Sequence, residues 1–428
     1  ASTSQLQWVI DAYLVVLAAL MMFSGALGDR VGRRRVLMLG LTIFGAGSVL
    51  CSLASSPLML IAMRALQAVG GSMLAPVALS IITNTFSDRA ERAQAIGLWG
   101  GVMGIGMALG PIVGGALVDA IDWRAVFWIN VPIVLLALAL VHRVVPESKG
   151  DDAGRIDVAG QLLAIAALAS LTFAIIEGGE RGFTAWPVLV SAGVALAAGA
   201  AFVAVERRVA SPLLDLRFFG SAPFALATVI AVLAFFAFAG FLFVATLYLQ
   251  NERGLSPLHA GLATLPMALA NAACAPLSGW LVGKVGNRRP MTAAAALMAV
   301  SAAMLLRLEP ATSLAWFIAA GVCMGMAVGL VNAPITNTAV SGMPPSHAGV
   351  AGATASTARQ LGQSLGVAVL GALLNAGMQK GQAFADASHA GWWLLLAAAL
   401  LIGVLAVLGT TARARASEAR VAAQIGRG

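Results

Sequence analysis

Apolar runs long enough to cross a lipid bilayer recur along almost the whole of this 428-residue chain. A membrane-spanning helix needs about 20 mostly apolar residues, because the hydrocarbon core is about 30 Å thick and a helix rises about 1.5 Å per residue. Of all residues, 60% are hydrophobic and 10% are charged, a balance that excludes a dispersed soluble protein. The chain is therefore predicted to be an all-α polytopic membrane protein.

Thirteen of these runs are predicted to be membrane-spanning helices. The stretches between them are shorter and hold most of the charged residues. In chain order the predicted spans are Leu6–Leu27, Val36–Ala54, Pro57–Thr85, Ala93–Val118, Ala125–Val145, Ile156–Ile176, Pro187–Val205, Phe224–Leu249, Ala260–Val282, Met291–Leu308, Ser313–Val340, Gly349–Ala376 and Gly391–Thr411.

The lysines and arginines predict the orientation of these spans. When alternate loops are assigned to the two sides, 19 of the 26 Lys and Arg residues fall on the side of the loop after the first span, and five fall on the other. Only Arg64 and Arg359 lie well inside spans, because Arg143 and Arg307 lie within two residues of a predicted span end and are counted with the adjoining loops. Cytoplasmic loops hold an excess of Lys and Arg, so the first loop and the C-terminus are expected to be cytoplasmic. The net charge of +8 follows from this orientation, and no nucleic-acid partner is expected.

The gap after the first span combines glycines, one acid and several arginines in a G-x-L-x-D-R-x-G-R-R-R pattern. Its main residues are Gly25, Asp29, Arg30, Gly32, Arg33, Arg34 and Arg35. A similar stretch, Gly279–Arg289, follows at an offset of 254 residues, with Gly283 where Asp29 stands. A second echo, at an offset of 256, pairs Gly106, Gly110 and Gly115 with Gly362, Gly366 and Gly371. Duplicated halves are typical of secondary transporters.

The duplication also predicts how the chain is divided. In the second half, the span Phe224–Leu249 precedes the span that ends in the repeated loop, and its counterpart would lie before Ala1. A fourteen-span molecule is therefore expected, with its first span upstream of this chain. We predict an N-terminal half at 1–145, a two-span linker at 146–219, and a C-terminal half at 220–428 that ends in a short, disordered basic tail.

Four local patterns resemble those of a known family. Gly25–Arg35 resembles the signature loop of the major facilitator superfamily, and Arg64–Gly71 resembles its R-x-x-Q-G motif, with Ala68 at the usual glycine. Gly106–Gly115 resembles the antiporter motif, and Trp123–Pro132 is similar to a stretch typical of the drug-transporting branch. With the expected layout of six, two and six spans, the chain resembles the fourteen-span drug:proton antiporters of this superfamily.

This resemblance implies a fold and a function. The fold is two six-helix halves plus two linker helices, and the function is proton-coupled export of amphipathic drugs or small metabolites by alternating access. It implies small hydrophobic or cationic substrates, a bacterial cytoplasmic membrane as location, and a molecule that works as a monomer. The proton gradient is the expected energy source, and no cofactor is expected.

Two alternatives remain at this point. One is an importer or exporter of a single nutrient or metabolite on the same fold. The other, more distant, is a membrane-embedded enzyme. The four histidines lie in loops or at span ends, and none pairs with an acid at the spacing of metal ligands. The three cysteines lie in apolar runs and are expected to pack there, so neither a metal site nor enzymatic chemistry is predicted.

Asp29 is the acid of the first loop. A carboxylate at this place can cap the positive N-terminus of a neighbouring helix and pair with an arginine. The resemblance implies that Asp29 and its loop hold a cytoplasmic gate in one conformation. Because Gly283 replaces Asp29 in the repeat, this latch is predicted to be one-sided. The plainer interpretation is a tight turn whose charges only set the topology.

Arg64 and Gln67 share one face of the third predicted span. Arg64 lies seven residues after Pro57, roughly 10 Å into the bilayer at ~1.5 Å per residue. An arginine at that depth needs water or a partner. The resemblance implies that Arg64 tunes a protonatable acid near the substrate path. The alternative is a structural cation whose side chain snorkels outward.

Asp11 is the one acid well inside an apolar run. A carboxylate there could gain and lose a proton as access to water alternates, which makes Asp11 a candidate for proton coupling. Alternatively, Asp11 lies at the wet interface beside Trp8 and Tyr13, which would form part of an aromatic belt.

The fourth span contains Gly106, Gly110, Pro111, Gly114 and Gly115. Glycines at this spacing let two helices approach closely, and a proline softens one turn. The resemblance implies that this run is the hinge and seal of an antiporter. Plain helix packing is the alternative.

The C-terminal half offers three candidates for lining a cavity: Asn332, Arg359 and Gln363. Polar side chains inside a helical bundle either line a water-filled path or bond to neighbouring helices, and both interpretations stay open here. Glu177 and Glu180, at the end of the sixth predicted span, are expected to be solvated loop charges.

Overall fold

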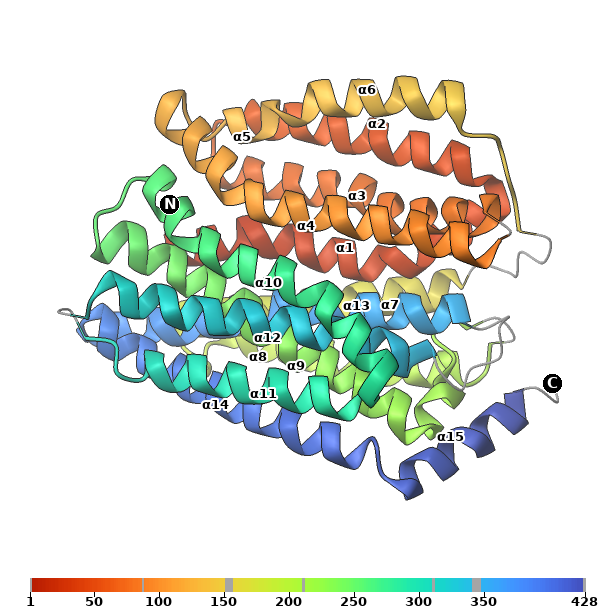
Figure 1. Cartoon of the computed structure of the whole chain (residues 1–428). Helices are drawn as coiled ribbons and strands as arrows, with labels where there is room; N and C mark the ends of the chain where they lie inside the picture. The colour runs from red at the N-terminus through yellow and green to blue at the C-terminus, as the bar shows by residue number, and fades with distance from the viewer. Residues whose placement is uncertain are drawn as a thin grey trace. The chain divides into compact units, whose positions relative to one another are not determined.

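The computed structural model describes residues 2–86, 88–150, 157–209, 212–309, 312–340 and 348–425, and within these ranges every regular element is a helix. The helices are labelled in Figure 1. They are α1 (Thr3–Val31), α2 (Arg33–Ser52), α3 (Pro57–Thr85), α4 (Arg89–Ala120), α5 (Ala125–Trp128), α6 (Asn130–Val144), α7 (Val158–Arg181), α8 (Trp186–Glu206), η1 (Leu216–Gly220), α9 (Ala222–Leu247), η2 (Tyr248–Glu252), α10 (Pro257–Val285), α11 (Arg288–Leu305), α12 (Leu314–Val340), α13 (Ala348–Gln379), α14 (Phe384–Leu408) and α15 (Ala412–Ile425).

The predicted fold class is confirmed, and each predicted span coincides with a helix or with two consecutive helical segments. Eleven helical stretches in the described part of the chain are long and apolar enough to cross a membrane, counting α5 with α6 and α9 with η2 as one each. The other two predicted spans coincide with α4 and α11. In α4 the described apolar stretch is Leu109–Ala120. The structure therefore agrees with a polytopic membrane protein.

Capping residues determine where several helices begin. At α1, the Ser2 hydroxyl accepts a bond from the Gln5 main-chain N–H (3.2 Å), and the Gln5 amide oxygen accepts one from the Ser2 N–H (2.9 Å). Ser56 and Ser256 cap α3 and α10 by accepting a bond from a main-chain N–H three residues later, and each is followed by a proline at the first helical position. Proline is favoured there because its missing N–H would have no partner within the helix.

In each repeated loop, the helix before the loop is capped by a glycine with a positive φ angle. α1 ends at Gly32, whose φ is 128°, and α10 ends at Gly286, whose φ is 74°. L side chains rarely adopt positive φ, so glycine is needed at both places. The sequence repeat is thus also a repeat of backbone geometry.

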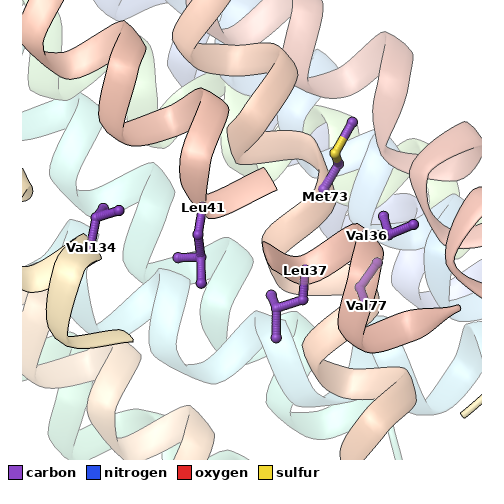
Figure 2. Packing of buried hydrophobic residues seen from close by; sticks show 6 residues of the cluster. All are labelled: Val36, Leu37, Leu41, Met73, Val77 and Val134. Atoms are coloured by element: carbon purple, nitrogen blue, oxygen red, sulfur yellow. The ribbon is translucent and has the colours of Figure 1, made fainter. Parts of the chain in front are cut away.

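The chain divides into two compact units, and each is described by itself. The first comprises Ala1–Met103 and Ala116–Leu213. In it, α1 packs on α2, α3 and α7, α2 packs on α3 and α6, and α7 packs on α8. The two linker helices therefore group with the N-terminal helices. Figure 2 shows a core cluster that joins α2, α3 and α6, made of Val36, Leu37, Leu41, Met73, Val77 and Val134.

The second unit comprises Gly104–Gly115 and Leu214–Gly428. α9 packs on α13, α10 on α12, and α11 on α12 and α14. Two glycines of α13 let it approach α9 closely. A Cβ at Gly362 would meet the main-chain carbonyl of Val232, and one at Gly366 would meet that of Phe236. Close backbone approach of this kind stabilises helix pairs in membranes. An aromatic cluster fills the unit's core and comprises Phe241, Tyr248, Phe317, Phe384 and Trp392.

The prediction of a disordered tail is wrong for the tail residues that the structure describes. They form α15, which packs on α9 and η1. Ala414, Ser417 and Val421 are buried, and the Ser417 hydroxyl accepts a hydrogen bond of 2.9 Å from the main-chain N–H of Ala222 at the start of α9. Their spacing of three and four residues places them on one helix face, a periodicity that the basic composition of the tail conceals.

Candidate functional site

A hydrogen-bonded chain of polar side chains lies inside the first unit. Arg64 on α3 donates from Nε to the carbonyl of Val9 on α1 (3.1 Å) and from Nη1 to Oε1 of Gln67 (2.6 Å). Gln67 in turn donates from Nε2 to the hydroxyl of Ser48 on α2 (2.6 Å), and Asn130 on α6 donates to the same hydroxyl (3.3 Å). Arg64 and Gln67 share a face because they are three residues apart. The network therefore ties four helices together.

Tyr13 closes this network on the side of α1. The Arg64 guanidinium carbon lies 4.2 Å from the centre of the Tyr13 ring and 5.9 Å from that of Phe127. A cation over an aromatic face is attracted by the ring quadrupole. The Arg64 side chain thus points to protein groups and does not snorkel outward. Tyr13 is therefore part of the network around Arg64.

Asp11 lies on α1 between Val9 and Tyr13, the two residues that contact Arg64. Its side chain is fully buried, at 0% exposure, as is that of Gln7 one turn earlier. The alternative that placed Asp11 at a wet interface is therefore wrong. A buried carboxylate in a membrane span must be protonated or have partners, because an isolated charge there is very unfavourable. The structure brings the predicted acid and the predicted arginine to the same part of one unit.

Glu177 differs from its prediction as a solvated loop charge. It is only 7% exposed, and its carboxylate accepts from the indole N–H of Trp8 on α1 (3.3 Å) and pairs with Arg181 (2.6 Å). Glu180 is exposed. A second bond from the linker, from Nε2 of Gln161 to the carbonyl of Ala19 (2.7 Å), also reaches α1. No local sequence pattern predicts this contact, because Glu177 and Trp8 are far apart in the chain.

The arginine loop is tied together within the first unit. Asp29 pairs with Arg33 at 2.8 Å, and its carbonyl accepts from the N–H of Gly150 (2.9 Å). No side chain caps α2, whose N-cap is Gly32. The structure thus places Asp29 beside an arginine of its own loop, and its predicted role as a gate residue stays a prediction.

The segment that follows α6 holds the other side of this loop. The main-chain N–H of Arg34 donates to Glu147 (3.1 Å), its guanidinium donates to the carbonyl of His142 (2.8 Å), and Arg35 lies 3.6 Å from the Glu147 carboxylate. Glu147 and His142 were not among the predicted residues. Partners distant in sequence can be found only once α6 is known to lie beside α2, as in Figure 1.

The repeated loop in the second unit is held by amides. Asn287 donates from Nδ2 to the hydroxyl of Thr338 on α12 (2.9 Å), and its Oδ1 accepts from Asn337 (3.0 Å). Lys284 lies with its ammonium 4.2 Å from the centre of the Trp280 ring. Thus the two loops share a backbone turn and use different side-chain chemistry.

The glycine run of α4 makes close contact at one end only. A Cβ on Gly115 would meet the carbonyl of Pro257, and a Cβ on Gly261 of α10 would meet that of Pro111. At Gly106, Gly110 and Gly114, in contrast, no atom of the described residues lies within 4 Å of the place a Cβ would take. Close helix approach along the whole run is therefore not observed, and the hinge role of the run stays a prediction.

Arg359 on α13 is brought together with α12. It donates from Nη2 to the hydroxyl of Thr336 and from Nη1 to that of Ser356 (3.2 Å). Asn332, one turn from Thr336, is exposed, and Gln363 is half-buried. The predicted cavity candidates of this half thus lie along the neighbouring helices α12 and α13.

Duplicated helical halves that enclose polar and ionisable side chains define this molecule as a secondary transporter of the polytopic α-helical class. A family model described as Major Facilitator Superfamily matches residues 1–367, and the chain belongs to this superfamily.

Several proteins in the superfamily are similar to this chain. The Multidrug resistance protein Stp of Mycobacterium tuberculosis is 38% identical over 371 residues, which are 87% of this chain and 69% of that protein. The Multidrug efflux pump LfrA of Mycolicibacterium smegmatis is 37% identical over 380 residues, covering 88% of this chain and 74% of LfrA. The Methyl viologen resistance protein SmvA of Salmonella typhimurium is 33% identical, covering 88% and 76%.

Two solved structures are similar to this chain in fold alone. An auto-inhibited peptide transporter of the POT family matches with a TM-score of 0.64 and 17% identity, over 95% of this chain and 88% of that chain. The human organic anion transporter MFSD10 matches with a TM-score of 0.61 and 16% identity, over 92% and 83%. Fold similarity at such identity does not carry substrate information.

Proposed function

We propose that this protein is a proton-coupled exporter of small amphipathic drugs or metabolites that works by alternating access. The observation that supports it most is the fully buried Asp11, on the helix whose neighbouring residues hold Arg64. A carboxylate enclosed among membrane helices can take up a proton on one side and release it on the other when its access changes.

The direction of transport rests on the relatives. Stp is named for multidrug resistance and LfrA for multidrug efflux, and SmvA is named for resistance to methyl viologen, a cation. On these grounds we extend export, and small hydrophobic or cationic substrates, to this chain. An importer of one nutrient has no such support among these relatives.

Location and mode of action complete the proposal. The protein would lie in a bacterial cytoplasmic membrane with its C-terminus in the cytoplasm, act as a monomer, and need no cofactor beside the proton gradient. Asp29 would hold the cytoplasmic gate through its pair with Arg33, and the Gly106–Gly115 run would serve as the hinge.

The test is transport into inverted membrane vesicles that contain the protein, using a panel of cationic and neutral dyes. We expect dye uptake that collapses when only the pH gradient is dissipated and persists when only the electrical potential is removed. Uptake that does not depend on the pH gradient would refute proton coupling. Absence of uptake for the whole panel, with the protein correctly inserted, would refute drug export.

A further inference from the structure

Arg359 stands out among the ionisable side chains of the second unit. Among the Asp, Glu, Lys, Arg and His residues in the described membrane-spanning helices of this unit, it is the one more than five positions from a helix end. The ion pairs formed by the described residues do not include it. A permanent cation in this position is costly unless it serves a binding or transport path.

The contacts of Arg359 leave donor capacity unused. It donates to two hydroxyls, those of Thr336 and Ser356, and its guanidinium carbon lies 5.9 Å from the centre of the Phe235 ring on α9. Its Nε has no protein partner within the described residues, nor has Oε1 of the adjacent Gln360. A guanidinium offers five N–H donors, and buried polar groups are rarely left without a partner. Hydroxyls orient the guanidinium but do not neutralise it.

The side of α12 next to Arg359 is both exposed and polar. Asn332, Thr336 and Asn337 are all exposed there, and Thr336 is the residue that Arg359 contacts. In a bilayer an exposed polar face does not lie against lipid tails; it lines a path that water or a solute enters. The guanidinium therefore lies at the edge of such a path, beside an aromatic ring.

We propose that Arg359 is a specificity-determining residue that binds an anionic group, a carboxylate or a phenolate, on the exported molecule. Arginine recognises such groups through paired N–H donors. This inference rests on the proposed export function and adds acidic amphipathic compounds to the hydrophobic and cationic substrates proposed above.

The experiment uses three probes that share one fluorophore and differ in charge: dansylglycine, its methyl ester and dansylcadaverine. The protein is reconstituted into phosphatidylcholine vesicles, which hold no anionic lipid that could occupy the arginine, and a pH gradient is imposed. In Arg359→Gln we expect kcat/KM for dansylglycine to fall at least about tenfold, mainly through KM, and that for the ester to change less than about twofold.

Two matched variants complete the design. Arg359→Lys keeps the charge, so it should retain most of the transport of dansylglycine. Arg253→Gln removes an arginine of the same unit whose Nη1 bonds to the carbonyl of Thr312 near the ends of two helices, and it should leave all three probes unchanged. Equal losses for acid and ester in Arg359→Gln would show that Arg359 only braces α12 against α13, and would overturn the proposal.

A binding measurement distinguishes failure of this proposal from failure of the proposed export function. If the wild type moves none of the probes, export of such compounds fails, and dansyl fluorescence then measures equilibrium binding to the reconstituted protein. Weaker binding of the acid, but not of the ester, in Arg359→Gln would still support the site. If the wild type and Arg359→Gln bound dansylglycine with the same Kd, the site would be refuted.

Discussion

Each unit holds one arginine inside a membrane-spanning helix, and the two arginines are satisfied differently. Arg64 donates to a main-chain carbonyl and to Gln67, lies over Tyr13, and has the buried Asp11 on the helix that it contacts. Arg359 contacts two hydroxyls and a more distant aromatic ring. The two halves thus differ in how the arginine is bonded: Arg64 lies among several polar and aromatic partners, whereas Nε of Arg359 has no partner within the described residues.

The repeated loops differ in the same sense. Asp29 pairs with Arg33, and Glu147 lies against Arg34 and Arg35. The corresponding turn in the second unit depends on neutral amide bonds from Asn287. Charge pairs respond to ionic strength and protonation, whereas amide bonds do not. Of the two loops, only the first is therefore expected to change its contacts with ionic strength or pH.

The largest expected effect comes from Asp11→Asn. Asparagine has nearly the same shape but carries no titratable proton, so pH-driven dye transport should fall to background while the protein still inserts and folds. Transport in vesicles and the elution profile of the purified protein check both parts. Proton-driven efflux at the wild-type rate would show that Asp11 is not the proton carrier, and would remove the main functional contrast between the units.

Gln67→Ala should destabilise the first unit more than Gln363→Ala destabilises the second. Gln67 is 1% exposed and bonded to both Arg64 and Ser48, so its loss takes the acceptor from Nη1 of Arg64 and one of two donors from the Ser48 hydroxyl. Such losses cost about 1–3 kcal/mol per group. Unfolding by denaturing detergent, followed by tryptophan fluorescence, measures the difference. If the two variants were equally stable, the network around Arg64 would contribute no special stability.

Asp29→Asn should reduce transport about fivefold, because a partly exposed charge pair in a helix turn contributes about 0.3–1 kcal/mol. The matched change Asn287→Ala, in the repeated loop, should reduce it less and without dependence on salt. Insertion should be normal in both, as judged by protein amount in the membrane. A normal transport rate in Asp29→Asn would exclude the latch.

The smallest effect is expected for Glu177→Gln. The amide keeps an oxygen that accepts from Trp8 but loses the charge that pairs with Arg181, which is 58% exposed. We expect a loss of about 0.5–1 kcal/mol of stability, within the range for exposed pairs, and a small change in Trp8 fluorescence. Arg181→Gln should give a similar loss. A collapse of transport in either variant would mean that the linker controls α1 and does not merely dock on it.

Hydropathy was enough to predict the helices, because length and apolarity are set by the bilayer itself. The repeat was predicted from matching residues in the two loops. Helix spacing also predicted that Arg64 and Gln67 share an inward face. What the sequence could not supply were contacts between distant segments, such as Asn130 with Ser48 or Glu177 with Trp8. These depend on which helices are neighbours, and no local pattern encodes that choice.

Composition also misled in specific places. The arginines of the tail suggested disorder, although Ala414, Ser417 and Val421 form a packed face. The glycines of α4 suggested close approach along the whole run, whereas among the described residues it is found at Pro111 and Gly115. In both cases the residue types were noted correctly, but the sequence does not show which neighbouring helix they pack against.

Because α15 packs on the start of α9, a movement of α9 is expected to move α15 with it. Ser417 accepts a bond from the first residue of α9, and the same helix presents Phe235 to Arg359. A rigid spin label on the exposed face of α15 would therefore report the tilt of α9 from outside the bilayer. That position offers a way to follow the working cycle without placing a probe in the substrate path.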